Sequence, residues 1–156
     1  MKSANFKLLS LNVRGSGNFK KRRAIFTWCR RKKSDFILLQ ETHSTRETRD
    51  IWKNEWGGEI YFSHGKSNAR GVAVLIKNGL DHKIVRSVSD SNGRFLMLVI
   101  EIQDVDYTII NVYVPNTDGT AIGFINNVFD ILINENVVEE DNLIMRRDFN
   151  CKMNPK

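Results

Sequence analysis

The chain has 156 residues, of which 41% are apolar and 27% are charged, and these values are ordinary for one globular domain with its own core. Its two cysteines, Cys29 and Cys151, are too far apart in the chain to suggest a disulfide framework or a thiolate metal cluster. No stretch approaches the roughly 18 apolar residues of a membrane span, and no secretory cleavage site follows the first residues. We therefore expect a soluble intracellular domain, in the nucleus or cytoplasm and without contact to a membrane.

Positive charge is concentrated near the start of the chain. Residues 1–34 contain eleven Lys and Arg and no acid, whereas the other 122 residues carry thirteen basic and eighteen acidic side chains. The formal net charge of +6 therefore combines a basic first fifth with a mildly acidic remainder. Such asymmetry is typical of a surface that binds a polyanion, but also of a solvated helix face. Charge alone leaves both interpretations open.

Helices and strands are predicted to alternate in the first half of the chain. Phe6–Val13 and Phe36–Gln40 are predicted to be buried strands because they are short and mostly apolar. Between them, Phe19–Lys33 is predicted to be a helix whose inward side chains are Ile25, Phe26, Trp28 and Cys29. A short helix should follow, ended by Gly57 and Gly58 and holding Ile51, Trp52 and Trp56.

The second half is predicted to be mostly strands. Five of them should follow in quick succession: Glu59–Ser63, Gly71–Ile76, Lys83–Ser89, Phe95–Ile102 and Tyr107–Tyr113. A third helix, Gly123–Asn134, is predicted to bury Phe124, Val128, Phe129, Leu132 and Ile133. A last strand is expected at Asn142–Met145. The chain has no repeat and no internal linker, so we expect one domain of mixed α and β structure.

Polar side chains follow the predicted buried strands, at the points where these strands end. They comprise two carboxylates, several amides and one tyrosine: Asn12, Gln40, Glu41, Asn111, Tyr113, Asn116, Asp148 and Asn150. Strand ends in an α/β sandwich often converge on one rim, and an oxygen-rich site there suits Mg²⁺, which binds through one or two carboxylates. Taken singly, however, Asn and Asp at strand ends are also ordinary turn formers.

Five segments in order connect these positions: SLNVRG (10–15), LLQETH (38–43), SHGKSNARGVAVLI (63–76), IINVYVPN (109–116) and RDFN (147–150). Together they resemble the exonuclease–endonuclease–phosphatase superfamily. The resemblance is strongest to the apurinic-endonuclease-like domain of non-LTR (LINE-class) retrotransposons. It implies a four-layer α/β sandwich, with two mixed sheets flanked by helices, and Mg²⁺-dependent hydrolysis of phosphodiester bonds in DNA.

The resemblance also implies roles for individual residues. Glu41 would bind Mg²⁺, or Mn²⁺ in its place, with Asn12 beside it. Asp148 would deprotonate the attacking water, while Asn150 and Tyr113 would contact the scissile phosphate. Basic and polar side chains would bind the nucleic acid, and the candidates are Arg14, His43, Arg70, Lys20, Lys21, Arg22 and Arg23.

The sequence departs from the family pattern in two places. The family carries a Ser-Asp-His motif well after the Asp-Phe-Asn segment, whereas this chain stops at Lys156 and its three histidines all precede Tyr113. We therefore expect residues 1–156 to be the N-terminal two-thirds of such a domain, a sandwich incomplete at the C-terminus, with impaired activity. The family also has glycine where this chain has Arg147, which predicts a disturbed placement of Asp148 and a less basic carboxylate.

Two alternatives to a nuclease remain open on the sequence. The first is a non-catalytic remnant that binds nucleic acid through the basic Phe19–Lys33 segment. The second is a phosphoesterase of the same superfamily. The partners implied by the resemblance are DNA and a downstream reverse transcriptase in a longer polyprotein, with the domain itself a monomer.

Overall fold

The structure is a computed structural model that describes residues 5–115 and 118–148. Its strands form two four-stranded sheets. The first sheet has the order β1-β2-β4-β3, in which only β1 and β2 run parallel, and consists of β1 (Leu8–Asn12), β2 (Phe36–Gln40), β4 (Val72–Ile76) and β3 (Ile60–Ser63). The second has the order β5-β6-β7-β8, in which only β7 and β8 run parallel, and consists of β5 (Lys83–Ser89), β6 (Phe95–Ile102), β7 (Val105–Tyr113) and β8 (Leu143–Asp148).

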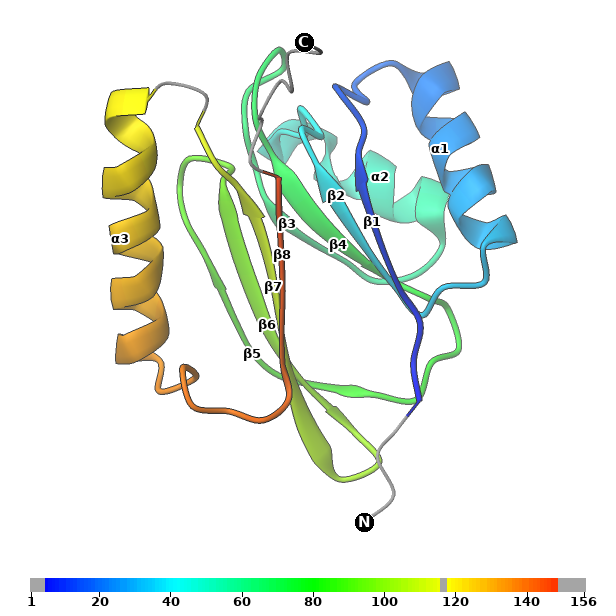
Figure 1. Ribbon diagram of the computed structural model, residues 1–156. Helices are drawn as coiled ribbons and strands as arrows, with labels where there is room; N and C mark the ends of the chain where they lie inside the picture. Colours follow the sequence, from blue (N-terminus) through cyan, green and yellow to red (C-terminus); the bar gives the residue numbers. More distant parts are fainter. Residues whose placement is uncertain (1–4, 116–117, 149–156) are drawn as a thin grey trace, which may run out of the picture.

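Helices cover the outer face of each sheet (Figure 1). The first sheet is covered by α1 (Phe19–Arg31) and by α2 (Arg49–Trp56), which follows the short 3₁₀ turn η1 (Arg46–Thr48). The second sheet is covered by α3 (Asp118–Asn134). The result is the four-layer α/β sandwich that the sequence predicted. None of the described helices is long and apolar enough to cross a membrane.

Local sequence explains where two of these helices begin and end. The Asn18 side chain accepts a hydrogen bond of 3.1 Å from the backbone N–H of Lys21, which caps the start of α1. Gly57 ends α2 with a φ of 76°, a left-handed conformation that glycine adopts without cost. Lys33, which was expected to lie inside α1, also has a positive φ, and α1 ends at Arg31.

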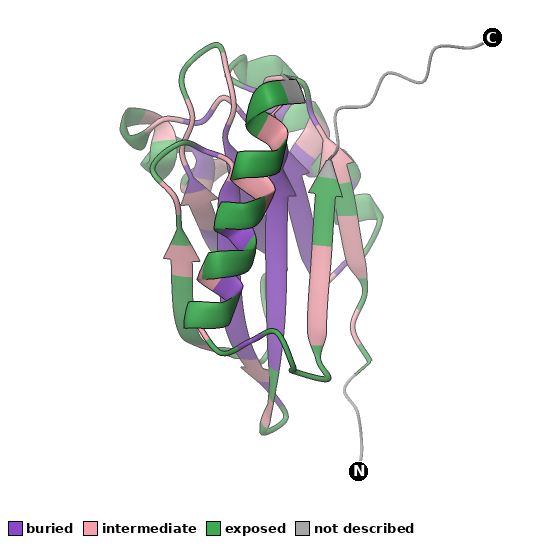
Figure 2. Cartoon of the chain, turned by 60° about the vertical axis from the view of Figure 1, so that its left-hand side comes forward, coloured by how far each residue is buried: buried purple, intermediate pink, exposed green. Residues whose placement is uncertain are grey.

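The core has three parts, one between the sheets and one under each helical layer. All five side chains of β2 are buried, as are all five of β4, because both faces of the first sheet are covered. Figure 2 shows α3 in front of the buried strands, with the outward side of this helix exposed. Trp52 and Trp56 are buried under α1, while Ile51 faces outward.

Three side chains that were predicted to be inward are instead exposed. Phe129 is 53% and Ile133 59% exposed, because Val128 and Leu132, one position earlier, occupy the inner face of α3. Trp28 is 40% exposed because Phe26 and Cys29 take the inner face of α1, and the Lys32 ammonium lies 5.0 Å from its ring centroid. A single helical position turns a side chain by about 100°, which is enough to change its environment.

Candidate active site

Strand direction brings five loops to one rim of the sandwich. In the first sheet β1 and β2 end at the paired residues Asn12 and Gln40, and the antiparallel β4 begins opposite them at Val72. In the second sheet β7 ends at Tyr113, close to the start of the antiparallel β6 at Phe95. The loops that follow β1, β2 and β7 and precede β4 and β6 are therefore neighbours.

A buried amide pair joins the two sheets beneath this rim. Gln40 Nε2 donates to Asn111 Oδ1 at 2.8 Å, and Asn111 Nδ2 donates to the carbonyls of Leu39 and Ala73 at 3.0 and 2.9 Å. Both side chains are buried, so these bonds satisfy polar groups that would otherwise cost free energy. The pair fixes the polar ends of β2 and β7 relative to each other.

Asn12 and Glu41 lie side by side on this rim. Asn12 Nδ2 donates to Glu41 Oε1 at 3.0 Å, and Asn12 Oδ1 accepts from the Arg14 backbone N–H at 2.9 Å. The second bond fixes the orientation of the Asn12 amide, and the first holds the carboxylate. One carboxylate with an adjacent amide is a donor set that fits Mg²⁺, a cation that keeps several of its waters. Within the described residues, no group of three or more acidic, His or Cys side chains forms a larger metal site.

A hollow of about 490 Å³ opens beside Glu41. It is lined by one carboxylate, three cations and four other residues: Glu41, Lys66, Arg70, Arg94, His43, Asn68, Ala69 and Tyr113. The Arg94 guanidinium lies 5.2 Å from the Tyr113 ring centroid, a cation–π contact, and Arg94 Nη1 donates to the Tyr113 carbonyl at 3.4 Å. The hollow therefore places a mostly positive surface next to the Asn12–Glu41 pair.

Electrostatics make this hollow suitable for an anion. Burial lowers the pKa of Arg94 below its ordinary value, and the nearby charge of Arg70 lowers this pKa further. Both effects mean that the positive charge of Arg94 is poorly solvated and close to a like charge. A bound anion, such as a phosphate, would relieve both costs.

Left-handed backbone conformations are concentrated in the same loops. The left-handed residues include Arg14, Glu41, His43 and Arg70, with φ values of 50°, 52°, 56° and 62°. Residues other than Gly rarely adopt this region. Hydrogen bonds between loops hold them: the Gly15 N–H donates to the Glu41 carbonyl at 2.6 Å, and the His43 N–H donates to the Arg70 carbonyl at 2.8 Å. The loops are thus fixed by one another rather than by regular secondary structure.

Within its described part, the structure gathers five of the twelve site residues that the sequence indicated. Glu41, His43, Arg70 and Tyr113 line one hollow, and Asn12 bonds to Glu41. Asp148 is described in its backbone only, which pairs with Tyr113 at the end of β8, and Asn150 lies outside the described residues. β8 pairs regularly with β7 as far as Asp148, with Arg147 opposite Val112, and the predicted effect of Arg147 on the Asp148 carboxylate concerns a side chain outside the described part of the structure.

The basic candidates on α1 differ in burial. Arg22 is buried: its guanidinium forms an ion pair with Glu55 and donates to the carbonyls of Ser16 and Gly17 at 3.1 and 3.0 Å. It therefore faces the interior and not a ligand. Exposed side chains at Lys20, Lys21 and Arg23 remain, and Lys21 Nζ donates to the Arg14 carbonyl.

Two cations of the hollow, Lys66 and Arg94, were missed by the sequence analysis. Arg94 immediately precedes β6, whose start lies beside the end of β7. A basic residue directly before a buried antiparallel strand is a signal that could have found it. Lys66 lies in the same SHGKSNARGVAVLI segment (63–76) as Arg70, and its place in that segment is the signal that could have found it.

Comparison with known proteins identifies the family. Residues 9–143 match the endonuclease/exonuclease/phosphatase family, and the chain belongs to it. A curated relative, the transposon TX1 uncharacterized 149 kDa protein of Xenopus laevis, is 26% identical over 147 residues, which cover 94% of this chain and 11% of that protein. The domain is thus related in sequence to a transposon protein, of which it spans about a tenth.

Solved structures share the fold at low sequence identity. The endonuclease domain of TRAS1, a telomere-specific non-LTR retrotransposon, matches with a TM-score of 0.63 and 14% identity, over 95% of this chain and 60% of that one. The AP endonuclease LMAP from Leishmania major matches with a TM-score of 0.66 and 19% identity, over 93% of this chain and 55% of that one. The chain therefore spans between half and two-thirds of the length of these structures.

Proposed function

We propose that this chain is part of a Mg²⁺-dependent DNA endonuclease domain of retrotransposon type, which nicks DNA by hydrolysing a phosphodiester bond. The observation that carries the proposal is the Asn12–Glu41 pair, bonded at 3.0 Å, beside a hollow lined by Lys66, Arg70 and Arg94. A metal-dependent DNA nuclease combines a metal-binding carboxylate with cations that bind the flanking phosphates. The relationship to retrotransposon proteins supports DNA as the substrate.

Glu41 and Asn12 would hold the metal. Mg²⁺ bound there would supply positive charge to the scissile phosphate and favour ionisation of a water. Glu41 would contribute the ligating carboxylate oxygen, and Asn12 would keep that carboxylate in place through its bond to Oε1. His43, from the loop that carries Glu41, would orient a water or a phosphate oxygen at the rim of the hollow.

The remaining roles belong to the second sheet. Asp148 would accept a proton from the attacking water. The water oxygen would bond to phosphorus while the bond from phosphorus to the leaving sugar oxygen breaks. Tyr113 and Asn150 would donate hydrogen bonds to the phosphate oxygens, where negative charge increases in the transition state. Arg70 and Arg94 would hold the strand on either side. Tyr113, Asn150 and the two arginines are neutral or cationic donors, so they would not compete with Glu41 for the metal.

Two readouts test the proposal on the 156-residue chain. The first is nicking of supercoiled plasmid in Mg²⁺ against EDTA, by wild type and by Glu41→Gln, which keeps the size of the side chain. The chain spans 55% and 60% of the two matched endonuclease structures, so we expect slow nicking that EDTA and Glu41→Gln both abolish. The second is Mn²⁺ binding measured by electron paramagnetic resonance, which does not depend on turnover. Wild-type chain that is folded but binds no Mn²⁺ would contradict the proposal.

A phosphoesterase is the alternative that shares this metal site. A mannosyl-6-phosphatase of Bacteroides thetaiotaomicron has the same fold, with a TM-score of 0.68 and 13% identity. Hydrolysis of para-nitrophenyl phosphate without nicking of plasmid would favour that alternative. The mostly cationic hollow favours a polymeric phosphodiester, since three cations exceed what one small phosphoester needs.

A further inference from the structure

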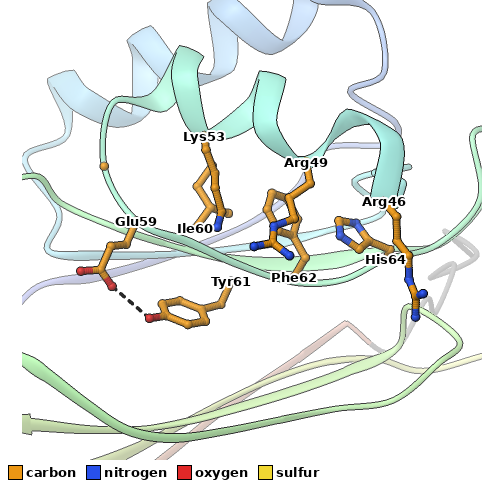
Figure 3. Close-up of a pocket in the computed structure, with 9 residues that line it drawn as sticks. Arg46, Arg49, Lys53, Glu59, Ile60, Tyr61, Phe62 and His64 are labelled. Atoms are coloured by element: carbon orange, nitrogen blue, oxygen red, sulfur yellow. Dashed lines mark hydrogen bonds between the residues drawn. The ribbon is translucent and has the colours of Figure 1, made fainter.

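A second and larger hollow lies away from the Glu41 rim, between α2 and the edge strand β3 (Figure 3). Its volume is about 650 Å³. Its walls come from η1 and α2 on one side and from β3 on the other: Arg46, Arg49, Lys53, Gly58, Glu59, Ile60, Tyr61, Phe62 and His64. We call it the α2–β3 cleft.

Three cations form a row along one wall of the α2–β3 cleft. Arg46, Arg49 and Lys53 are three and four positions apart, a spacing that places side chains on one face of a helix. Figure 3 shows all three extending from the helical wall into the cleft, toward the segment that contains β3. Among the described residues, none of the three donates a side-chain hydrogen bond or forms an ion pair. Their charge is therefore available to a ligand.

Acidic charge in the cleft is small and lies at one end. Glu59 is the one carboxylate among the lining residues, and it accepts a hydrogen bond of 3.1 Å from the Tyr61 hydroxyl. Its other oxygen lies 3.3 Å from His82 Nε2. Glu59 thus has partners of its own, and the row of three cations gives the cleft a net positive charge.

Aromatic rings line the opposite wall. Phe62 in β3 and His64 directly after it lie on the same face, and their rings stack at 4.6 Å between centroids with 20° between planes, while the Tyr61 ring packs against the core between the sheets. Burial lowers the pKa of His64 from 6.5, and the charges of Arg49 and Arg46 lower it further. His64 is therefore mainly neutral at pH 7 and presents an aromatic ring rather than a fourth cation.

We propose that the α2–β3 cleft binds a single strand of nucleic acid, with phosphates on the Arg46, Arg49 and Lys53 row and bases against the aromatic wall. From Arg46 to Lys53 the row is about 10 Å long at about 1.5 Å per residue, a length of two or three nucleotides. Cations that follow the backbone and rings that stack on bases are the two features that proteins combine to hold single strands. Stacked bases of a duplex would not expose their faces to this wall.

The position of the cleft suits a strand that also crosses the Glu41 rim. His64 lines the α2–β3 cleft and Lys66, two residues later, lines the hollow beside Glu41. The binding proposed here needs no hydrolysis, so its test is independent of the test of the nuclease proposal.

Fluorescence anisotropy with labelled dodecamers of dT and of U, in EDTA to prevent hydrolysis, tests the proposal. The test variant replaces Arg46, Arg49 and Lys53 by Gln. The matched control replaces Arg31, Lys77 and Lys83 by Gln, three exposed cations elsewhere on the surface with the same total charge. We expect the test variant to raise Kd at least about tenfold and the control at most about threefold. The slope of log Kd against log salt should fall by about 2, because three contacts contribute about 0.7 each.

Further arms separate this proposal from its rivals. Arg46→Lys with Arg49→Lys should retain binding, and a 12-residue abasic strand should bind several times more weakly than dT. Equal loss in the test and control variants would mean that only net charge matters, and would overturn the proposal. So would equal binding of the abasic strand, or a test variant that weakens duplex binding as much as single-strand binding. Aggregation of the test variant with unchanged Kd would show that the row only protects an edge strand.

Discussion

Two basic regions of this molecule differ in what their charges do. The first is α1, which carries most of the basic residues of the N-terminal fifth. There Arg22 is buried against Glu55, and Arg30 Nη2 donates to the carbonyls of Glu55 and Trp56 at 2.6 and 2.8 Å. The second is the sparser row of Arg46, Arg49 and Lys53, which faces an open cleft.

The difference teaches that charge density in a sequence does not locate a binding surface. Arg22 and Arg30 lie over the rings of Trp52 and Trp56, at 5.3 and 5.0 Å from their centroids, so both guanidiniums are part of the contact between α1 and α2. What decides the role of each cation is whether the fold supplies a partner for it. Glu55 is that partner for Arg22, 33 positions later in the chain.

The largest effect should come from removing Arg22. In Arg22→Ala, Glu55 would keep a largely buried carboxylate without its counter-charge, and the carbonyls of Ser16 and Gly17 would lose their donor. Breaking a buried ion pair in this way costs about 3 kcal/mol of unfolding free energy. Urea unfolding followed by circular dichroism measures the change.

Lys20→Ala is the control for Arg22→Ala, since Lys20 is exposed on the same helix and should change the unfolding free energy by less than about 0.5 kcal/mol. A loss below about 1 kcal/mol in Arg22→Ala would contradict the structural role of this arginine. The two basic regions would then no longer differ as described.

The second prediction concerns Cys29, on the inner face of α1. Burial raises the pKa of this thiol from 9.0 to about 11. At pH 8 the thiolate fraction should therefore be about 100-fold lower in the folded than in the unfolded protein. Because the pKa is higher in the folded state, the contribution of the protonated Cys29 thiol to the unfolding free energy is complete below pH 9. It is lost as the pH rises toward 11.

Alkylation by iodoacetamide at pH 8 measures the reactivity of Cys29, in a Cys151→Ser background so that one thiol is followed. The native rate should be at least about 100-fold below the rate in 6 M urea. Equal rates would show that the inner face of α1 is open to solvent, contrary to the packing described.

Much of the fold could be predicted from the sequence, because the buried strands are short apolar runs. Phe36–Gln40 and Phe95–Ile102 have the bounds that were predicted, and so does Lys83–Ser89, although this strand is mostly exposed. Trp28, Phe129 and Ile133 were placed inward by hydrophobicity, which does not specify the face of a helix to within one position. The start of α3 was placed five residues late because Asp118–Ile122 is mainly polar or small.

The candidate site was predictable where a motif marks it and not elsewhere. Glu41 and Tyr113 follow buried strands within recognisable segments, so their meeting in one hollow could be expected. Arg94 and the row of Arg46, Arg49 and Lys53 belong to no motif, and their importance depends on which strands and helices become neighbours. That information is tertiary, as is the pairing of Arg22 with Glu55.

The third prediction tests the lesser structural cation of α1. Arg30→Ala removes two hydrogen bonds to carbonyls at the last turn of α2, which lack partners within that helix, and a cation–π contact with Trp56. Arg30 is exposed overall, so we expect a loss of about 1 kcal/mol, well below that of Arg22→Ala. Differential scanning calorimetry should place its Tm between those of Arg22→Ala and wild type. A Tm equal to wild type would make Arg30 a surface charge like Arg23.

The smallest effect is expected in the row that faces the cleft. Arg46→Ala and Arg49→Ala remove cations that make no side-chain hydrogen bond or ion pair with other described residues, so each should change the unfolding free energy by less than about 0.5 kcal/mol. Arg46 and Arg49 both disfavour a positive charge on His64, so removing either cation should raise the pKa of His64. Urea unfolding under the conditions used for Arg22→Ala allows direct comparison. A loss above about 1 kcal/mol in either variant would mean that the row, like Arg22, stabilises the fold, and its charges would no longer be free for a nucleic acid strand.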